Sequence, residues 1–136
     1  AYQSIISVPG VNELNLTNEF TLMAWVNLAT VSGRGYFYAK NIPNEGYKFG
    51  VVNGQLYVRL QNTDYISNTS NLTITGNWVH VVATWKAGNP VSFFVNGVSN
   101  GQSSSFTGQI STTTSPLFIG GDNGNFNING SINDVR

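Results

Sequence analysis

Apolar and polar residues alternate along much of this chain with a period of two. The clearest case is the stretch "EFTLMAWVNLA" over residues 19–29, where polar and apolar positions take turns. Its alternating apolar positions are Phe20, Leu22, Ala24, Val26 and Leu28. This period indicates a β-strand with one buried face. Further strand-like runs follow, with Gly, Asn or Pro between them, and no stretch has a convincing helical period. The pattern predicts an all-β sandwich or barrel.

Two turn signals and two special segments refine this prediction. Asn53-Gly54 and Asn96-Gly97 each separate two alternating runs, which predicts two tight hairpins. The run "NWVHVVATW" over 77–85 is largely apolar on both faces, so we expect a central strand that is covered on both sides. The low-complexity run over 99–115 predicts a surface loop or an edge strand, and "SPLFIGG" predicts a further short strand.

Composition restricts the function classes. The chain has 136 residues, a length that fits one domain, and 40% of them are hydrophobic, as in a globular protein. Six basic residues balance six acidic ones and are scattered, which argues against a nucleic-acid partner. No apolar run approaches the length of a membrane span, so we expect no membrane insertion. A neutral surface rich in amides and hydroxyls is typical of extracellular and virion-exposed proteins.

Three ordered stretches resemble the laminin-G-like branch of the concanavalin A-like lectin/glucanase superfamily. "LNLTNEFTLMAWVNL" is similar to an early strand of the family. "GNWVHVVATWKAGNPVSFFVNGV" resembles its central signature of a Trp, a nearby His, an apolar strand and an Asn-Gly turn. "PLFIGGDNGNFNINGSINDVR" resembles its last motif. The resemblance implies an antiparallel, jelly-roll-like sandwich of two β-sheets that forms one domain over residues 1–136.

The resemblance also raises an expectation about both ends of the domain. Family members usually begin with one more strand and usually continue beyond the Val-Arg pair that stands here at 135–136. We therefore expect the outermost terminal strands to be missing. An unpaired strand edge at that place would readily pair with another chain, so we expect flanking domains or neighbouring copies of the chain to cover it.

The acidic residues and the single histidine do not predict catalysis. Glucanases of this fold carry a Glu-x-Asp-x-x-Glu strand, because glycoside hydrolysis needs two carboxyl groups across the bond. The acidic residues of this chain are isolated from one another: Glu13, Glu19, Glu45, Asp64, Asp122 and Asp134. His80 has no nucleophile and acid beside it in the sequence, and we interpret it as a structural residue. We expect no enzyme activity and no catalytic residues.

A calcium site is the first candidate for ligand chemistry. Calcium binds oxygen ligands from Asp, Asn and backbone carbonyls, and many relatives bind it at the rim of the sandwich. The Gly-rich loop "GGDNGNFN" supplies Asp122, Asn123 and Asn125. The alternative is a turn that these side chains stabilise by bonding to their own backbone. Asp64, next to Tyr65, is a second calcium candidate.

A saccharide site is the second candidate. Tyrosine combines an apolar ring with a polar tip, which suits the C–H face and the hydroxyls of a sugar. Tyrosines gather in the middle of the chain, with Asn41, Asn44, Gln61 and Asn62 between them. The candidate carbohydrate-binding residues are Tyr36, Tyr38, Asn41, Asn44, Tyr47 and Tyr65. The alternative is that the tyrosines belong to the core or to ordinary cross-strand pairs.

These observations predict a non-catalytic binding or adhesion module that acts on carbohydrate. Its partner would be a glycan or a cell-surface or virion protein. It would be part of a larger extracellular, cell-surface or virion protein and would need no cofactor other than calcium. The alternative is a structural module of a filament, fibre or capsid decoration that binds no small molecule and adds a neighbour's strand to an open edge.

Overall fold

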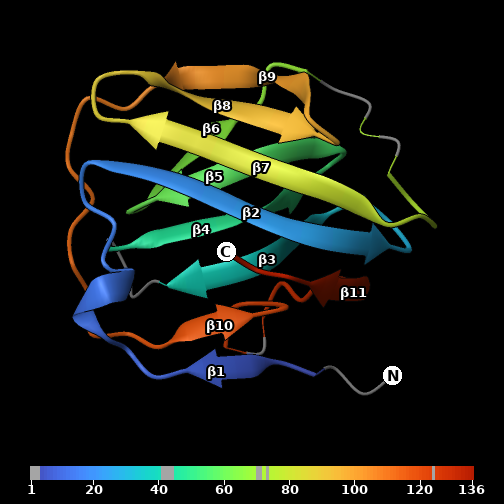
Figure 1. Ribbon diagram of the computed structural model, residues 1–136, viewed down its shortest axis with the longest axis horizontal. Coiled ribbons are helices and arrows are strands. Elements are labelled where there is room, and N and C mark those ends of the chain that lie inside the picture. The colour runs from blue at the N-terminus through green and yellow to red at the C-terminus, as the bar shows by residue number, and fades with distance from the viewer. Residues whose placement is uncertain (1–3, 41–44, 70–71, 73, 124) are drawn as a thin grey trace.

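The computed structural model describes residues 4–40, 45–69, 72, 74–123 and 125–136. It contains two antiparallel β-sheets that pack face to face, which confirms the predicted sandwich. Figure 1 shows the two layers, with β2, β7 and β8 drawn in front of β3, β4 and β5. Within the described ranges, no helix is long and apolar enough to cross a membrane.

The first layer, sheet A, has six strands in the order β1-β10-β3-β4-β5-β6. Its strands are β1 (Ile6–Val8), β10 (Leu117–Ile119), β3 (Arg34–Lys40), β4 (Tyr47–Val52), β5 (Gln55–Leu60) and β6 (Thr63–Ile66). The second layer, sheet B, has five strands in the order β11-β2-β7-β8-β9. Its strands are β11 (Gly130–Asn133), β2 (Glu19–Leu28), β7 (Val79–Lys86), β8 (Pro90–Val95) and β9 (Val98–Ser105). A single 3₁₀ turn, η1 (Asn12–Leu14), precedes β2.

The core lies between the two sheets and follows the predicted alternation. On β2, the buried side chains are those of Phe20, Leu22, Ala24, Val26 and Leu28, the set that the period of two selects. Sheet A contributes alternate apolar residues from β4 and β5 to the same cluster. Burial of this apolar area is the main force that holds the two layers together.

Both predicted hairpins are present. Asn53 and Gly54 join β4 to β5 with φ angles of 47° and 79°. Asn96 and Gly97 join β8 to β9 with φ angles of 50° and 79°. Positive φ at both central residues is the geometry of the type I′ turn, whose twist matches that of the flanking strands. The Asn-Gly pairs therefore fix the register of both hairpins.

The strand β7 lies in the interior of its sheet, as predicted, but only one of its faces is covered, whereas the sequence predicted that both would be. The strand lies between β2 and β8 in the interior of sheet B. Val79, Val81, Ala83 and Trp85 point into the core and are buried, whereas the outward side chains His80, Val82 and Thr84 are only half-buried. A two-layer sandwich covers one face of each sheet, so apolar residues on the other face stay accessible to solvent.

The remaining sequence predictions concern the sheet edges. Residues 99–105 of the low-complexity run belong to β9, the outer strand of sheet B, and residues 106–115 are irregular chain, so each of the two alternatives holds for one part of the run. At the other edge, β11 pairs with β2. The pairing continues beyond β11, because Arg136 and Met23 exchange backbone hydrogen bonds of 2.8 and 2.9 Å.

Candidate functional site

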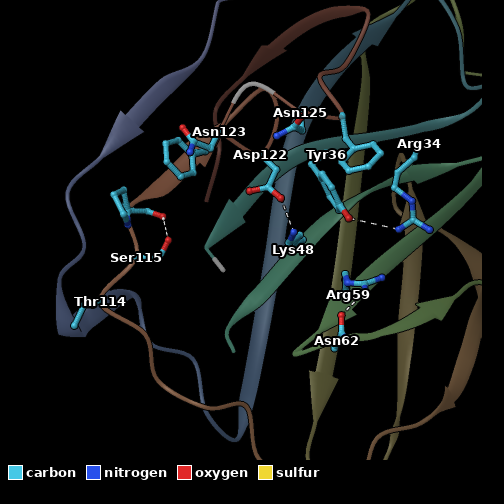
Figure 2. Close-up of a pocket in the computed structure, with 13 residues that line it drawn as sticks. Arg34, Tyr36, Lys48, Arg59, Asn62, Thr114, Ser115, Asp122, Asn123 and Asn125 are labelled. Carbon is cyan, nitrogen blue, oxygen red and sulfur yellow. Dashed lines mark hydrogen bonds and ion pairs between the residues drawn. The ribbon is translucent and has the colours of Figure 1, made fainter. Parts of the chain in front are cut away.

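A groove of about 800 Å³ lies on the outer face of sheet A, and we call it the sheet-A groove. Its floor comes from the strands, and its walls come from the turn between β5 and β6, the segment before β10 and the loop after β10 (Figure 2). The floor consists of Arg34, Tyr36, Lys48, Arg59 and Phe118. The walls consist of Asn62, Thr114, Ser115, Pro116, Asp122, Asn123, Asn125 and Phe126. Strands far apart in the sequence therefore supply one continuous surface.

The pleat of the strands brings the floor residues together. Lys48 lies directly opposite Arg59 across the β4–β5 hairpin, and Arg59 lies opposite Asp64 on β6. Directly opposite residues point to the same face of an antiparallel sheet. Next to them, β3 and β4 approach closely at a bulge between Tyr36 and Tyr38. A Cβ atom on Gly50 would overlap the carbonyl oxygen of Gly35 there, so this approach requires glycine.

Asp64 organises the two arginines beside the groove. Its Oδ2 accepts a hydrogen bond from Arg34 Nη2 at 2.7 Å, and its Oδ1 accepts one from Arg59 Nη1 at 2.6 Å. Burial opposes ionisation of the carboxyl, but the hydrogen bonds from the two guanidinium groups outweigh it and lower the pKa of Asp64. The bond to Asp64 raises the pKa of Arg34. The two hydrogen bonds thereby fix both guanidinium groups in place.

Lys48 forms the second ion pair of the groove. Its Nζ lies 2.5 Å from Asp122 Oδ2 and 4.9 Å from the centre of the Tyr36 ring. Figure 2 shows Asp122 pointing down from its loop toward this lysine. Around the groove, the cations Arg34, Lys48 and Arg59 outnumber the carboxylates Asp64 and Asp122 by one charge. The surface therefore has a positive excess in a chain of zero net charge.

An exposed aromatic ring stands on the wall of the groove. Phe126 is 53% exposed and has a φ angle of 49°, a left-handed conformation that is uncommon for a bulky residue. Its carbonyl oxygen accepts a hydrogen bond of 2.9 Å from the Tyr36 N–H, and its ring meets the Tyr36 ring edge-on at 5.8 Å. Unusual backbone conformations persist where the surroundings enforce them, and they concentrate at functional sites.

The proposed calcium ligands Asp122, Asn123 and Asn125 lie together in the loop that forms one wall of the sheet-A groove. Asp122 and Asn125 exchange backbone hydrogen bonds of 2.8 and 2.9 Å in a tight turn, and Asn123 has a positive φ of 47°. The segment is a turn, as the alternative interpretation stated, although the hydrogen bonds between Asp122 and Asn125 join backbone atoms and not side chains. The Asp122 carboxylate already binds Lys48. Over the described parts of the chain, no group of three acidic, His or Cys side chains could hold a metal ion. Calcium binding remains a prediction, and at Asp122 the ion would compete with the Lys48 ammonium for the carboxylate.

The predicted sugar-binding tyrosines divide into two groups. Tyr36 lines the groove, although its ring is only 2% exposed. Tyr38, Tyr47 and Tyr65 belong to the core cluster with exposures of 2%, 3% and 8%, as the alternative interpretation stated. Burial raises the pKa of Tyr47 to about 12, and its hydroxyl donates a hydrogen bond to the Leu14 carbonyl at 3.1 Å.

The burial of these three tyrosines corrects the sequence-based site. Their rings contact other core side chains, for example Tyr65 against Phe106 at 5.4 Å between ring centres, so they offer no open face to a sugar. The other two predicted residues, Asn41 and Asn44, lie outside the described residues.

Sequence reasoning singled out Asp122 and Asp64, but it missed the three cations of the groove and the exposed ring of Phe126. The cations were interpreted as scattered, because they are far apart along the chain. The hairpin register would have found two of them. The turn at Asn53-Gly54 places Lys48 opposite Arg59, and counting outward from that turn requires no other information. The contribution of Arg34 and Phe126 depends on the neighbours of β3, which no local pattern reveals.

Comparisons with known proteins show which folds resemble that of this chain. Sequence comparison with curated proteins finds no match. Among solved structures, the chain is similar to domain 4 of an extracellular arabinanase from Geobacillus stearothermophilus in complex with arabinotriose. That match has a TM-score of 0.68 and 18% identity, and it covers 95% of this chain and 63% of the other.

Two further matches extend the comparison. Domains LG4-5 of the mouse laminin alpha1 chain match with a TM-score of 0.72 and 13% identity, over 98% of this chain and 39% of the other. A putative carbohydrate binding protein from Bacteroides ovatus matches with a TM-score of 0.69 and 17% identity, over 97% and 40%. The chain thus spans less than two thirds of each of these structures. A family model described as the concanavalin A-like lectin/glucanases superfamily matches residues 2–136.

Proposed function

Because the chain belongs to the laminin-G-like branch of the concanavalin A-like lectin/glucanase superfamily, we propose that it is a non-catalytic carbohydrate-binding module. The sheet-A groove is its binding site. The proposal also places the domain in a larger extracellular or surface-exposed protein, where its partner is a glycan. Similar folds in a domain that holds arabinotriose and in a putative carbohydrate binding protein are consistent with this proposal.

The observation that carries the proposal is the combination of groups in the groove. Guanidinium and ammonium groups on the floor donate hydrogen bonds, and the exposed side chains of Asn62 and Asn125 add amides at the wall. The exposed Phe126 ring offers an apolar face beside them. A sugar presents hydroxyls and C–H groups together, so it can engage both kinds of surface.

The charge of the groove narrows the ligand class. Each carboxylate beside the groove already binds a cation, and one positive charge is in excess. Arginine binds carboxylate and sulfate oxygens in a planar, two-pronged geometry. The groove therefore favours a saccharide that carries a carboxylate or sulfate group over an uncharged one.

In the part of the chain that the structure describes, the groove has no pair of free carboxylates, which supports the proposal that the module is non-catalytic. Asp64 and Asp122 are the carboxylates beside the groove among the described residues, and both are held by cations. Glycoside hydrolysis needs one carboxyl group that stays protonated as an acid and a second that acts as base or nucleophile. The lowered pKa of Asp64 is opposite to what a general acid requires.

A second candidate function is a structural module that pairs with neighbouring chains through its sheet edges. The outer strands favour it, because β1 and β9 expose the apolar side chains of Ile6 (59%) and Val98 (70%), and β9 carries no charged residue. Light scattering at increasing protein concentration tests this candidate. Growth beyond the monomer mass supports it, and a constant monomer mass contradicts it.

A glycan array displayed at high density tests the proposed function. We expect binding to acidic glycans, and we expect Arg59→Met and Phe126→Ala each to weaken it about tenfold. Val98→Ala is the matched control, because it removes an exposed apolar side chain from the other sheet. Repeating the array with a chelator separates calcium-dependent binding from direct binding. Absence of binding to every acidic glycan contradicts the proposal, and so does binding that both groove variants leave unchanged.

A further inference from the structure

Two tryptophans lie exposed on the outer face of sheet B, on the opposite side of the sandwich from the sheet-A groove. Trp25 is 40% exposed and Trp78 is 47% exposed, whereas Trp85 is buried in the core. Both side chains are large and apolar, yet about half of each remains exposed to solvent. Exposed aromatic clusters with polar surroundings mark interaction sites more often than single scattered apolar residues do.

Strand register brings polar groups to these rings. Asn133 on β11 lies opposite Trp25 on β2, and Trp25 lies opposite His80 on β7. An amide, an indole and an imidazole therefore form a row across the outer face. The His80 ring packs against Trp25 with 5.3 Å between ring centres and 40° between planes, which supports the indole from one side.

A shallow hollow of about 410 Å³ lies between the two indoles. It is lined by Trp25, Trp78, Asn133 and Asp134, and we call this surface the tryptophan platform. Asp134 Oδ1 accepts a hydrogen bond of 2.9 Å from Arg136 Nε, and the Asn133 Oδ1 accepts one of 2.8 Å from the Asp134 N–H. These bonds hold the polar end of the hollow in a defined orientation beside the rings.

We propose that the tryptophan platform is a second saccharide-binding site, and that it takes an uncharged sugar. Indole faces stack on the C–H faces of a sugar ring, while the Asn133 amide and the Asp134 carboxylate bond to its hydroxyls. The proposal goes beyond the sheet-A groove, because the two sites share no residue and lie on different sheets.

The size and charge of the platform favour a sugar over a protein partner. A stable protein interface buries roughly 800 Å² on each side, whereas this hollow is lined by four residues. The charged group among them is the Asp134 carboxylate, which is paired with Arg136, so none of these four residues offers a cation to an acidic sugar. A ligand that stacks on two rings and bonds to an amide and a carboxylate is therefore an uncharged saccharide.

The test is an array of uncharged gluco-, galacto-, manno-, xylo- and arabino-oligosaccharides displayed at high density. We expect the wild type to bind at least one of them. Trp25→Ala and Trp78→Ala should each weaken that binding about tenfold or more. Trp25→Tyr keeps an aromatic ring and should therefore bind more tightly than Trp25→Ala. Trp78 precedes β7, so its replacement leaves strand pairing intact. Circular dichroism and thermal melting verify that each variant is folded.

The controls separate this proposal from the first one. Arg59→Met removes a charge from the sheet-A groove and should leave binding of uncharged glycans unchanged. Val98→Ala should also leave it unchanged. The proposal is overturned when no uncharged glycan binds, or when both tryptophan variants bind like the wild type. It is likewise overturned when the tryptophans instead govern self-association, as measured by light scattering of the wild type and Trp78→Ala.

Discussion

At the scale of single residues, the charged side chains beside the groove act as pairs. Asp64 joins Arg34 to Arg59, and Asp122 binds Lys48. The Arg34 guanidinium also lies over the Tyr57 ring, 4.8 Å from its centre. Partly buried pairs of this kind orient the cations, so a ligand meets fixed donors and not mobile side chains. Removing one member leaves the other without its partner in a partly buried site.

Asp64→Asn tests this pairing through its dependence on pH. The two arginines lower the folded-state pKa of Asp64 below its unfolded value. Ionised Asp64 thus stabilises the fold above the unfolded pKa, and this contribution is lost as the pH falls through the folded pKa. We expect Asp64→Asn to lower the free energy of unfolding by about 1–3 kcal/mol at neutral pH. The difference from wild type should shrink below about pH 4.

Urea denaturation of wild type and Asp64→Asn at several pH values measures this difference. Glu19→Gln is the control, because Glu19 is 71% exposed and lies 3.9 Å from Lys86. Its effect should stay below about 0.5 kcal/mol. A constant difference between wild type and Asp64→Asn across the acidic range would show that the carboxylate charge does not stabilise the fold.

Lys48→Met tests calcium binding at Asp122. The Lys48 ammonium binds Asp122 Oδ2 and repels a second cation at the same carboxylate, so the wild type should bind calcium no more tightly than about millimolar. Removing the competing charge should strengthen calcium binding about tenfold. Isothermal titration calorimetry measures both affinities, and Lys86→Met at the exposed surface is the control. Equal affinities of wild type and Lys48→Met would show that Asp122 is not a ligand.

At the scale of elements, the turns and a close approach between two strands determine which side chains each strand directs to each face of its sheet. The Asn-Gly turns are local, so the sequence predicted them together with the strands that flank them. The bulge between Tyr36 and Tyr38 and the contact of β3 with Gly50 are not local, because they depend on which strands become neighbours. The sequence therefore predicted strands and hairpins well. The candidate site still included three tyrosines, Tyr38, Tyr47 and Tyr65, that lie on the core face of sheet A and are buried.

Two glycine substitutions should separate local strain from loss of packing space. Gly54→Ala places a side chain at a φ of 79° with open space around its Cβ, so it should cost about 1–2 kcal/mol of stability. Gly50→Ala should cost about 3 kcal/mol or more, since its Cβ overlaps the Gly35 carbonyl oxygen and forces β3 away from β4. Urea denaturation of both variants measures the costs. Equal costs would contradict the close approach of the two strands.

At the scale of the whole molecule, the sandwich presents two outer faces of different chemistry. The face of sheet A carries cations and amides, whereas the face of sheet B carries exposed indoles beside an amide and a carboxylate. The sequence motifs predicted the fold, because a family signature records alternation and turns in order along the chain. Sequence reasoning named Tyr36 and the loop residues of the groove but neither its cations nor the tryptophan platform. The residues of each surface come from strands that are distant in the sequence and adjacent only in the folded sheet.

The positions of the two surfaces predict that they act independently. Arg59→Met should weaken binding of acidic glycans about tenfold and spare uncharged ones, while Trp78→Ala should do the reverse. The double variant should be weakened for both classes, and its stability change should equal the sum of the single changes within about 0.5 kcal/mol, as for distant residues without shared partners. Glycan arrays and urea denaturation of the four proteins measure this. A coupling energy well above that limit, or cross-effects on binding, would mean that the groove and the platform form one connected site.

Independence of the two sites instead predicts that a surface displaying both glycan classes binds the domain more tightly than a surface displaying either class alone. This gain requires that one domain can reach both glycans at once.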